Sequence, residues 1–153
     1  MKPIKIITLL AIVIIIGFMY VSVQSSPVLS DEKYSYLGGL TWNKNIDEGF
    51  RIAQEQNKPI LVYFWAQWCK YCEQLETKTL PNEKVSKILK NDFVLVAIDL
   101  DEQGEVAQRY GVSYPPHELF LDKNGNIITR IPGYVDANRF LMELKEVKKG
   151  VKV

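Results

Sequence analysis

The chain has 153 residues, enough for one domain of ordinary size, and its 19 basic and 18 acidic residues give a formal net charge of +1. This balance excludes the clear basic excess of a phosphate-binding surface, so we expect no nucleic-acid partner. With two cysteines and one histidine, the chain also lacks the four ligands of an intramolecular structural zinc site unless a carboxylate contributes.

The first predicted element is an uncharged apolar run over residues 6–23, preceded by Lys2 and Lys5. Its 18 residues are typical of a membrane-spanning helix, whereas the apolar region of a secretory signal peptide is usually about 7 to 15 residues long. The lysines precede the run and acidic residues follow it, which predicts a cytoplasmic N-terminus. Residues 1–24 are therefore predicted to be a single-pass anchor in the cytoplasmic membrane, with the C-terminal domain outside. A secreted or periplasmic protein after signal cleavage is the alternative.

A linker and then one folded domain follow this run. Residues 25–40 contain several serines and glycines and little apolar patterning, which is typical of a linker. Residues 41–150 remain for the domain. Its predicted elements are a helix over 45–57, a strand over 60–65, helices over 72–80 and 82–91, a strand over 93–101, a helix over 102–111, a hairpin over 118–131 and a helix over 136–150.

Local signals support these elements. Asn45 and Glu48 have the spacing of a helix capping box, and Asn124-Gly125 is a strong hairpin signal. The run "ILVYFW" at 60–65 is apolar throughout, which suits a strand buried on both faces. Strands that alternate with helices and end in a hairpin predict an α/β domain around a mixed sheet.

Three interpretations of Cys69 and Cys72 compete, and both cysteines directly follow the strand at 60–65. A structural disulfide would close a very small loop and so add little stability. A zinc site would lack ligands, because His117 is the only histidine. A redox pair suits the position best, because the first turn of a helix offers unpaired N–H groups and a positive dipole end to a thiolate.

In the redox interpretation the two cysteines have different tasks. Cys69 lies at the start of the predicted helix, and Lys70 adds a positive charge beside it. Cys72 lies one turn inside the same helix, within reach of Cys69. We therefore expect Cys69 to be the exposed nucleophile and Cys72 the resolving thiol.

Two segments resemble the thioredoxin superfamily. The segment "FWAQWCKYC", Phe64 to Cys72, is similar to the family signature "FWAxWCxxC". The segment "YGVSYPPHELFLDKNG" at 110–125 resembles the part that carries the family's cis-proline and leads into its hairpin. The resemblance covers residues 42–148. It implies a thioredoxin-like fold, with a central mixed β-sheet flanked by α-helices, and thiol-disulfide exchange for which we expect neither a cofactor nor a metal.

Within this superfamily, the anchor and the segment "WCKYCEQLE" look most like extracytoplasmic thiol-disulfide interchange proteins, including the C-terminal domain of the transmembrane reductase of bacterial envelopes. By that resemblance Cys69 attacks, Cys72 resolves and forms a disulfide with it, and Pro116 is the cis-proline packed against this disulfide. The implied partners are protein disulfides or dithiols and a membrane electron donor. The residues expected to contact substrate are Trp68, Lys70, Tyr71, Pro115, Pro116 and His117.

Three positions depart from the family pattern. Tyr63 stands where cytoplasmic members keep a buried acid, so Glu76, one turn past Cys72, is the candidate proton acceptor, with a solvated helix-face glutamate as the alternative. Pro115 lacks the backbone N–H that family members offer to an extended substrate. His117 stands where threonine is commoner, and it either tunes the thiolate or has only a surface or packing role.

The aromatic residues near the cysteines have plain interpretations. Trp65 is expected in the core, Trp68 at the lip of the active site, and Tyr71 either over the disulfide or exposed in solvent. The dithiol predicts a thiol-disulfide oxidoreductase, and Lys70-Tyr71 between the cysteines favours a reducing or intermediate one. The alternative is a thioredoxin-fold binding or chaperone module without redox turnover, although a pure binder has no use for a dithiol.

Overall fold

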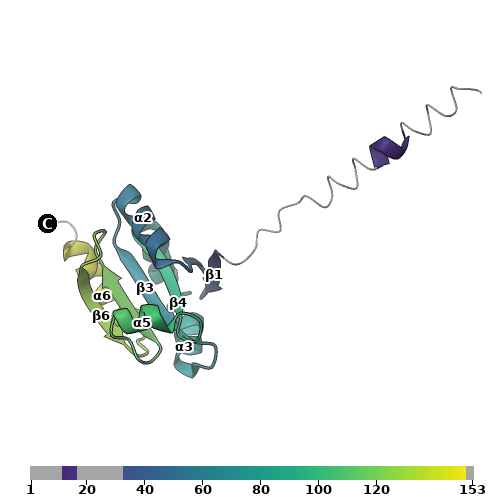
Figure 1. Cartoon of the computed structure of the whole chain (residues 1–153). Helices are drawn as coiled ribbons and strands as arrows, with labels where there is room; N and C mark the ends of the chain where they lie inside the picture. The colour runs from purple at the N-terminus through teal and green to yellow at the C-terminus, as the bar shows by residue number, and fades with distance from the viewer. Residues whose placement is uncertain (1–11, 17–32, 151–153) are drawn as a thin grey trace, which may run out of the picture. The chain divides into compact units, whose positions relative to one another are not determined.

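The computed structural model describes residues 12–16 and 33–150. The chain divides into two units, residues 1–30 and 31–153, and the second contains the sheet and the helices labelled in Figure 1. In the first unit residues 12–16 are helical. Most of the predicted membrane span, residues 6–23, lies outside the described residues. Within the two described ranges, no helix has the length and apolar character needed to cross a bilayer.

The second unit is built on one mixed six-stranded sheet. Its strand order is β1-β2-β4-β3-β5-β6, with β3 at the centre, parallel to β4 and antiparallel to β5. Hairpins form both edges, since β1 pairs antiparallel with β2 and β5 with β6. The strands are β1 (Tyr34–Leu37), β2 (Leu40–Asn43), β3 (Ile60–Trp65), β4 (Val94–Asp99), β5 (His117–Leu121) and β6 (Ile127–Pro132).

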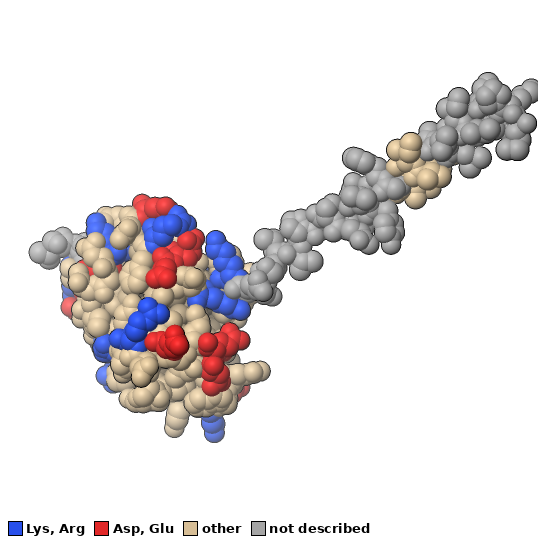
Figure 2. All heavy atoms as spheres, viewed as in Figure 1, with Lys and Arg blue, Asp and Glu red and all other residues tan. Residues whose placement is uncertain are grey.

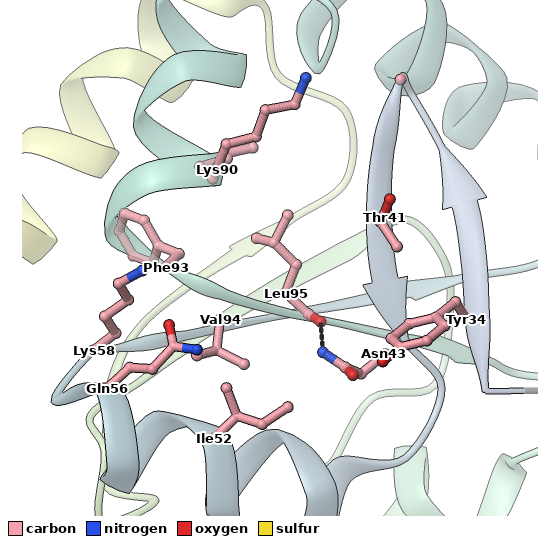
Figure 3. Close-up of a pocket in the computed structure, with 12 residues that line it drawn as sticks. Tyr34, Thr41, Asn43, Ile52, Gln56, Lys58, Lys90, Phe93, Val94 and Leu95 are labelled. Carbon is pink, nitrogen blue, oxygen red and sulfur yellow. Dashed lines mark hydrogen bonds between the residues drawn. The ribbon is translucent and has the colours of Figure 1, made fainter.

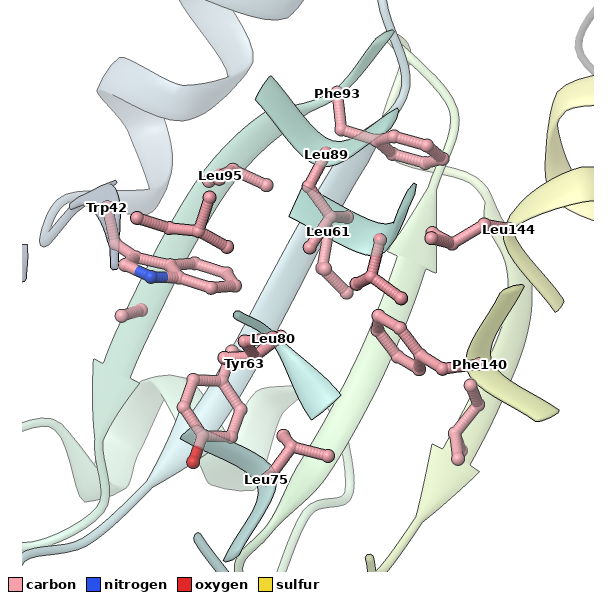
Figure 4. Close-up of a cluster of buried hydrophobic side chains, with 14 of the residues drawn as sticks. Trp42, Leu61, Tyr63, Leu75, Leu80, Leu89, Phe93, Leu95, Phe140 and Leu144 are labelled. Carbon is pink, nitrogen blue, oxygen red and sulfur yellow. The ribbon is translucent and has the colours of Figure 1, made fainter. Parts of the chain in front are cut away.

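Helices cover both faces of the sheet, which confirms the predicted α/β class. The side chains of α2 (Ile46–Gln56) and α5 (Gly104–Arg109) belong to one buried cluster. The other face carries the active-site helix and two longer helices, and it forms the larger cluster, part of which Figure 4 shows. The elements on this second face are α3 (Lys70–Gln74), η1 (Leu75–Thr79), α4 (Glu83–Asp92) and α6 (Ala137–Gly150).

The central strand β3 contributes to both clusters. Leu61 and Tyr63 enter the larger cluster, whereas Val62 and Phe64 enter the one beneath α2 and α5. This is the two-residue period of a strand covered on both sides, as its continuous apolar sequence predicts. Because β3 runs directly into α3, the position of the cysteines follows from the packing of this strand.

The predicted linker over 25–40 is wrong in its last residues, because residues 34–37 form β1. Gly38 and Gly39 have φ angles of +59° and +72° and make the turn into β2, a conformation that glycine adopts at little steric cost. Trp42 is fully buried, and its Nε1 donates to the Leu37 carbonyl at 3.0 Å. Ser35, Gly38 and Gly39, which were among the residues that suggested a linker, therefore belong to the edge strand and turn of the sheet.

Gly49 sets the distance between α2 and the sheet. A Cβ atom at this position would lie 2.4 Å from Val96 Cγ2 on β4. We expect Gly49→Ala to lower the free energy of unfolding by about 1–3 kcal/mol, as other overpacked cores do. Gly104→Ala is the matched control, because that helical glycine faces open space and its replacement should change stability by less than about 1 kcal/mol.

Urea unfolding of both variants would measure this difference. Combining Gly49→Ala with Val96→Ala should give a loss smaller than the sum of the two single losses, because the two side chains meet. Strict additivity would contradict the close packing of α2 on β4.

Candidate active site

The two cysteines form a disulfide at the start of α3, with their Cα atoms 5.2 Å apart. Cys69 is the N-cap residue of this helix, and its Sγ accepts a hydrogen bond of 3.1 Å from the Cys72 backbone N–H. The predicted pairing and the expected position of Cys69 at the helix N-terminus are both confirmed, although α3 begins at Lys70 and not at residue 72. An N–H group directed at Sγ favours a negative charge on this sulfur once the bond is opened.

The two sulfur-bearing residues differ in access. Cys69 keeps 7% of its surface exposed, and Cys72 keeps 1%. Both belong to the larger buried cluster. An attacking thiolate therefore reaches the disulfide from the Cys69 side.

Exposed aromatic side chains stand beside this edge. Trp68 is 67% exposed, and its Nε1 donates to Asp101 Oδ2 at 2.9 Å, so the loop after β4 holds the indole in place. Tyr71 is 60% exposed, so it lies in solvent rather than over the disulfide. Trp65 is partly buried and packs against the larger cluster, as the core interpretation predicts.

Glu76 lies near the cysteines, at the start of a π-helical turn. The sequence predicts one continuous helix over 72–80, but the structure has α3 followed by η1, in which the Leu80 N–H donates to the Leu75 carbonyl at 2.9 Å. A π turn rotates the side chains that follow it relative to an α-helix. Glu76 is half-buried and lines a hollow of about 360 Å³ together with both cysteines.

Tyr63 is the partner of Glu76. The Tyr63 hydroxyl donates to Glu76 Oε1 at 2.9 Å, and the Tyr63 ring packs against Trp42 with centroids 5.5 Å apart. Burial raises the pKa of the Glu76 carboxyl, the hydrogen bond from Tyr63 opposes that rise, and Glu73 adds to it. Burial and the Glu76 charge also raise the pKa of Tyr63, which keeps its hydroxyl a donor. Glu76 is thus tied to the core by Tyr63, unlike a free surface glutamate.

The proline pair precedes β5. The Pro115–Pro116 peptide bond is cis, as the family resemblance implies. Pro116 is buried and Pro115 is partly exposed. Lys70, which lines the hollow of the cysteines, and Tyr114, which precedes the proline pair, are both exposed.

His117 packs on the face of the sheet opposite Tyr63. It is 8% exposed, pairs in register with Phe64, and makes edge contacts with the rings of Phe64 and Tyr114. Burial lowers the pKa of the imidazole, and Arg130 lowers it further. A surface role is therefore excluded, and the packing interpretation agrees with these contacts.

Glu118 is the residue that sequence reasoning missed. It pairs in register with Tyr63 and so shares the face of the sheet that carries the cysteines. It is 1% exposed, and neither carboxylate oxygen has a hydrogen-bond partner among residues 33–150. Burial therefore raises the pKa of Glu118 well above its ordinary value. An acidic residue directly before the apolar residues 119–121, in a segment predicted to be a strand, was the signal available in the sequence.

Other surface features lie away from the cysteines. A hollow of about 460 Å³ opens where β2 leaves β4, and there Asn43 Nδ2 donates to the Leu95 carbonyl (Figure 3). It borders the first residues of β4, whereas the cysteines follow the last residue of β3.

Basic and acidic side chains are intermixed on the face of residues 33–150 in Figure 2. No group of three or more His, Cys, Asp or Glu in the described ranges is arranged to hold a metal ion.

Residues 46–148 match the sequence family described as a thioredoxin-like domain. The chain belongs to this family. The thiol:disulfide interchange protein DsbD of Yersinia pestis is 34% identical over 99 residues, which are 61% of this chain and 17% of that protein. DsbD of Colwellia psychrerythraea is 26% identical over 141 residues, 88% of this chain and 23% of that protein. The chain thus spans less than a quarter of these curated relatives.

Solved structures agree with this assignment. A thioredoxin from Thermus thermophilus superposes with a TM-score of 0.63 and 32% identity, over 69% of this chain and 85% of that one. The oxidised C-terminal domain of DsbD from Neisseria meningitidis gives 0.57 at 22% identity, over 66% and 90%. This second similarity shows the fold alone.

The buried acid of the thioredoxin-like domain should make its stability depend on pH. In the folded domain Glu118 holds its proton above the ordinary pKa of 4.5, whereas the unfolded chain releases it there. The folded state therefore loses about 1.4 kcal/mol for each pH unit between 4.5 and the folded pKa. Glu118→Leu removes this loss, so it should stabilise the domain more at pH 8 than at pH 4.

Thermal unfolding of both proteins at the two pH values tests this expectation. The exposed Glu73→Gln is the matched control and should follow the wild type at both pH values. A gain from Glu118→Leu that is equal at pH 4 and pH 8 would show that Glu118 is not held as the neutral acid.

Proposed function

We propose that this thioredoxin-like domain is a thiol-disulfide oxidoreductase that passes electrons to protein disulfides outside the cytoplasmic membrane. The Cys69–Cys72 disulfide at the start of α3 is the observation that carries the proposal. The printed names of its relatives, thiol:disulfide interchange proteins, support the same reaction. Lys70 and Tyr71 between the cysteines favour the reducing direction, and the electron donor we infer is a membrane protein.

The reaction begins at Cys69. In the reduced protein its thiolate attacks one sulfur of the substrate disulfide, and the other substrate sulfur leaves as a thiolate. This forms a mixed disulfide between Cys69 and the substrate. The Cys72 N–H at Cys69 Sγ stabilises the thiolate before the attack.

Cys72 completes the exchange. Its thiol gives a proton to Glu76, and its sulfur attacks Cys69 Sγ, which releases the second substrate sulfur. The protein is then in the disulfide form described above. Two electrons have moved to the substrate, and the proton from Cys72 passes through Glu76 to a released substrate sulfur or to water. The half-buried position of Glu76 beside Cys72 supports this role.

The substrate surface combines exposed side chains with an unusual backbone. Trp68, Lys70 and Tyr71 form the edge next to Cys69, and we assign them to substrate contact with Pro115 and Pro116. Since Pro115 has no N–H, an extended substrate loses one main-chain hydrogen bond there. Side-chain contacts with the aromatic edge then carry more of the binding. His117 is buried, and any influence it has on substrate passes through Tyr114 and Phe64.

The N-terminal segment bears on which side of the membrane the reaction takes place. We infer that residues 6–23 anchor the chain in the cytoplasmic membrane and that the thioredoxin-like domain lies on the extracytoplasmic side. The length of the uncharged run and the two lysines before it support this arrangement. A single-pass anchor would hold the domain near a membrane-bound electron donor.

Removing the resolving cysteine should trap the substrate. In Cys72→Ala the Cys69 thiolate still attacks, but the mixed disulfide has no internal thiol to resolve it. We expect disulfide-linked complexes that disappear on reduction, seen by non-reducing electrophoresis of cells that express the variant. Cys69→Ala is the control and should trap far less, because Cys72 is almost fully buried. Equal recovery of complexes from the two variants would reject the assigned roles, and none from either would support the alternative binding module.

The topology proposal has its own test. A reporter that is active only in the periplasm, fused after Val153, should be active in cells, whereas a cytoplasm-specific reporter at the same place should be inactive. Replacing Lys2 and Lys5 by Glu is the matched change, since it removes the charge bias that sets orientation. Activity confined to the cytoplasmic reporter would end the proposal.

A further inference from the structure

Glu118 is a buried carboxyl that the reaction above does not use. It is the second residue of β5, 1% exposed, and neither oxygen has a hydrogen-bond partner among residues 33–150. Its register neighbours are Tyr63 on β3 and Ile131 on β6. Ile131 is apolar, so Tyr63 is the polar cross-strand neighbour of Glu118. A charge at Glu118 is therefore poorly solvated and responds strongly to other charges nearby.

The cysteines occupy the same compartment as Glu118. Tyr63, Cys69 and Cys72 belong to one buried cluster, and the Tyr63 hydroxyl donates to Glu76 Oε1 at 2.9 Å. Glu76 in turn lines one hollow with both cysteines. Charges in such an interior are weakly screened, so a negative charge on a sulfur acts on the carboxyl groups of this compartment.

The charged side chains around the hollow that both cysteines line are Glu73, Glu76 and the exposed Lys70. Glu76 comes from η1, and Glu73 on α3 lies beside it. Tyr63 from β3 remains a neutral donor. Within residues 33–150, none of Glu118, Glu76 and Glu73 forms a salt bridge. No cation in this range is therefore paired with a carboxyl group of this compartment, and solvent screens the charge of the exposed Lys70.

We propose that Glu118 is a redox-linked proton site, which takes up a proton when the disulfide is reduced and releases it when the disulfide forms again. This inference rests on the proposed thiol-disulfide exchange. A donor dithiol loses two electrons and two protons and becomes a disulfide. The Cys69–Cys72 bond breaks, Cys69 becomes a thiolate, Cys72 takes one proton and the Glu118 carboxylate takes the other. Glu118 is thus a positioning residue, because it acts on the sulfurs through charge and not by contact with substrate.

The proposal predicts a pH dependence of the redox equilibrium. Below the pKa of Glu118 in the oxidised protein the residue is protonated in both states and contributes nothing. Above that pKa, reduction takes up one extra proton per two electrons, until the pH passes the pKa of Glu118 in the reduced protein. Over this interval the equilibrium constant changes by a further factor of up to about ten per pH unit, which is about 30 mV for a two-electron couple.

The test is a redox titration of the full chain in detergent against glutathione, repeated at intervals from pH 6 to pH 9. The variants are Glu118→Gln, which keeps the shape without the titration, and Glu118→Leu, which removes the polar group. Glu73→Gln is the matched control, an exposed acid on the active-site helix. We expect the redox equilibrium constant of the wild type and of Glu73→Gln to change more steeply with pH in the alkaline range. Both Glu118 variants should lack this additional pH dependence.

The same pH dependence of the redox equilibrium in all four proteins would overturn the proposal. A wild type that does not equilibrate with glutathione at any pH would instead reject the proposed exchange reaction, so the two failures are distinct. If Glu118→Gln does not fold, Glu118→Leu carries the comparison. The wild type alone gives a second measurement: its reduced-minus-oxidised infrared spectrum should gain a protonated-carboxyl band at alkaline pH. No gain at any pH between 7 and 9 would also overturn the proposal.

Discussion

The burial of β3 on both faces is the constraint on which the rest of the site depends. Successive side chains of a strand point to opposite faces, so Tyr63 enters the cluster of the cysteines and Phe64 enters the cluster beneath α2 and α5. The register of β5 on β3 extends this rule, because it places Glu118 beside Tyr63 and His117 beside Phe64. A slip of one residue would bring the imidazole, and not the acid, to the face of the disulfide.

The same face carries two carboxyl groups beside the tyrosine at position 63. The tyrosine there supplies bulk to the core and one hydroxyl to Glu76. Glu76, at the start of η1, lines the same hollow as both cysteines. Two carboxyl groups therefore stand around one tyrosine, one half-buried and one fully buried. Such an arrangement lowers stability, since an unpaired buried carboxyl is unfavourable, and it persists where it serves a function.

Access to the sulfurs is limited to one edge. Cys72 is nearly closed to solvent, and Cys69 is slightly open. Trp68 stands beside it, held by its hydrogen bond to Asp101 from the loop after β4. An attacking thiolate therefore has access to the disulfide on the Cys69 side, next to Trp68. The hollow at the other end of β4 lies apart from this chemistry, so a single strand end, the carboxyl end of β3, organises the reaction.

Sequence alone determined the elements whose signals are local. The cap at Asn45, the apolar run of β3, the Asn124-Gly125 turn and the adjacent cysteine pair depend on neighbours within a few residues, and the structure confirms each of them. Tertiary structure alone decided the rest. The hairpin of β1 and β2 forms because Trp42 is buried against the sheet, the π turn depends on how α3 packs, and the site of Glu118 depends on strand register. These features join residues far apart in the chain, and the free energy that selects them comes from burial, which no local pattern records.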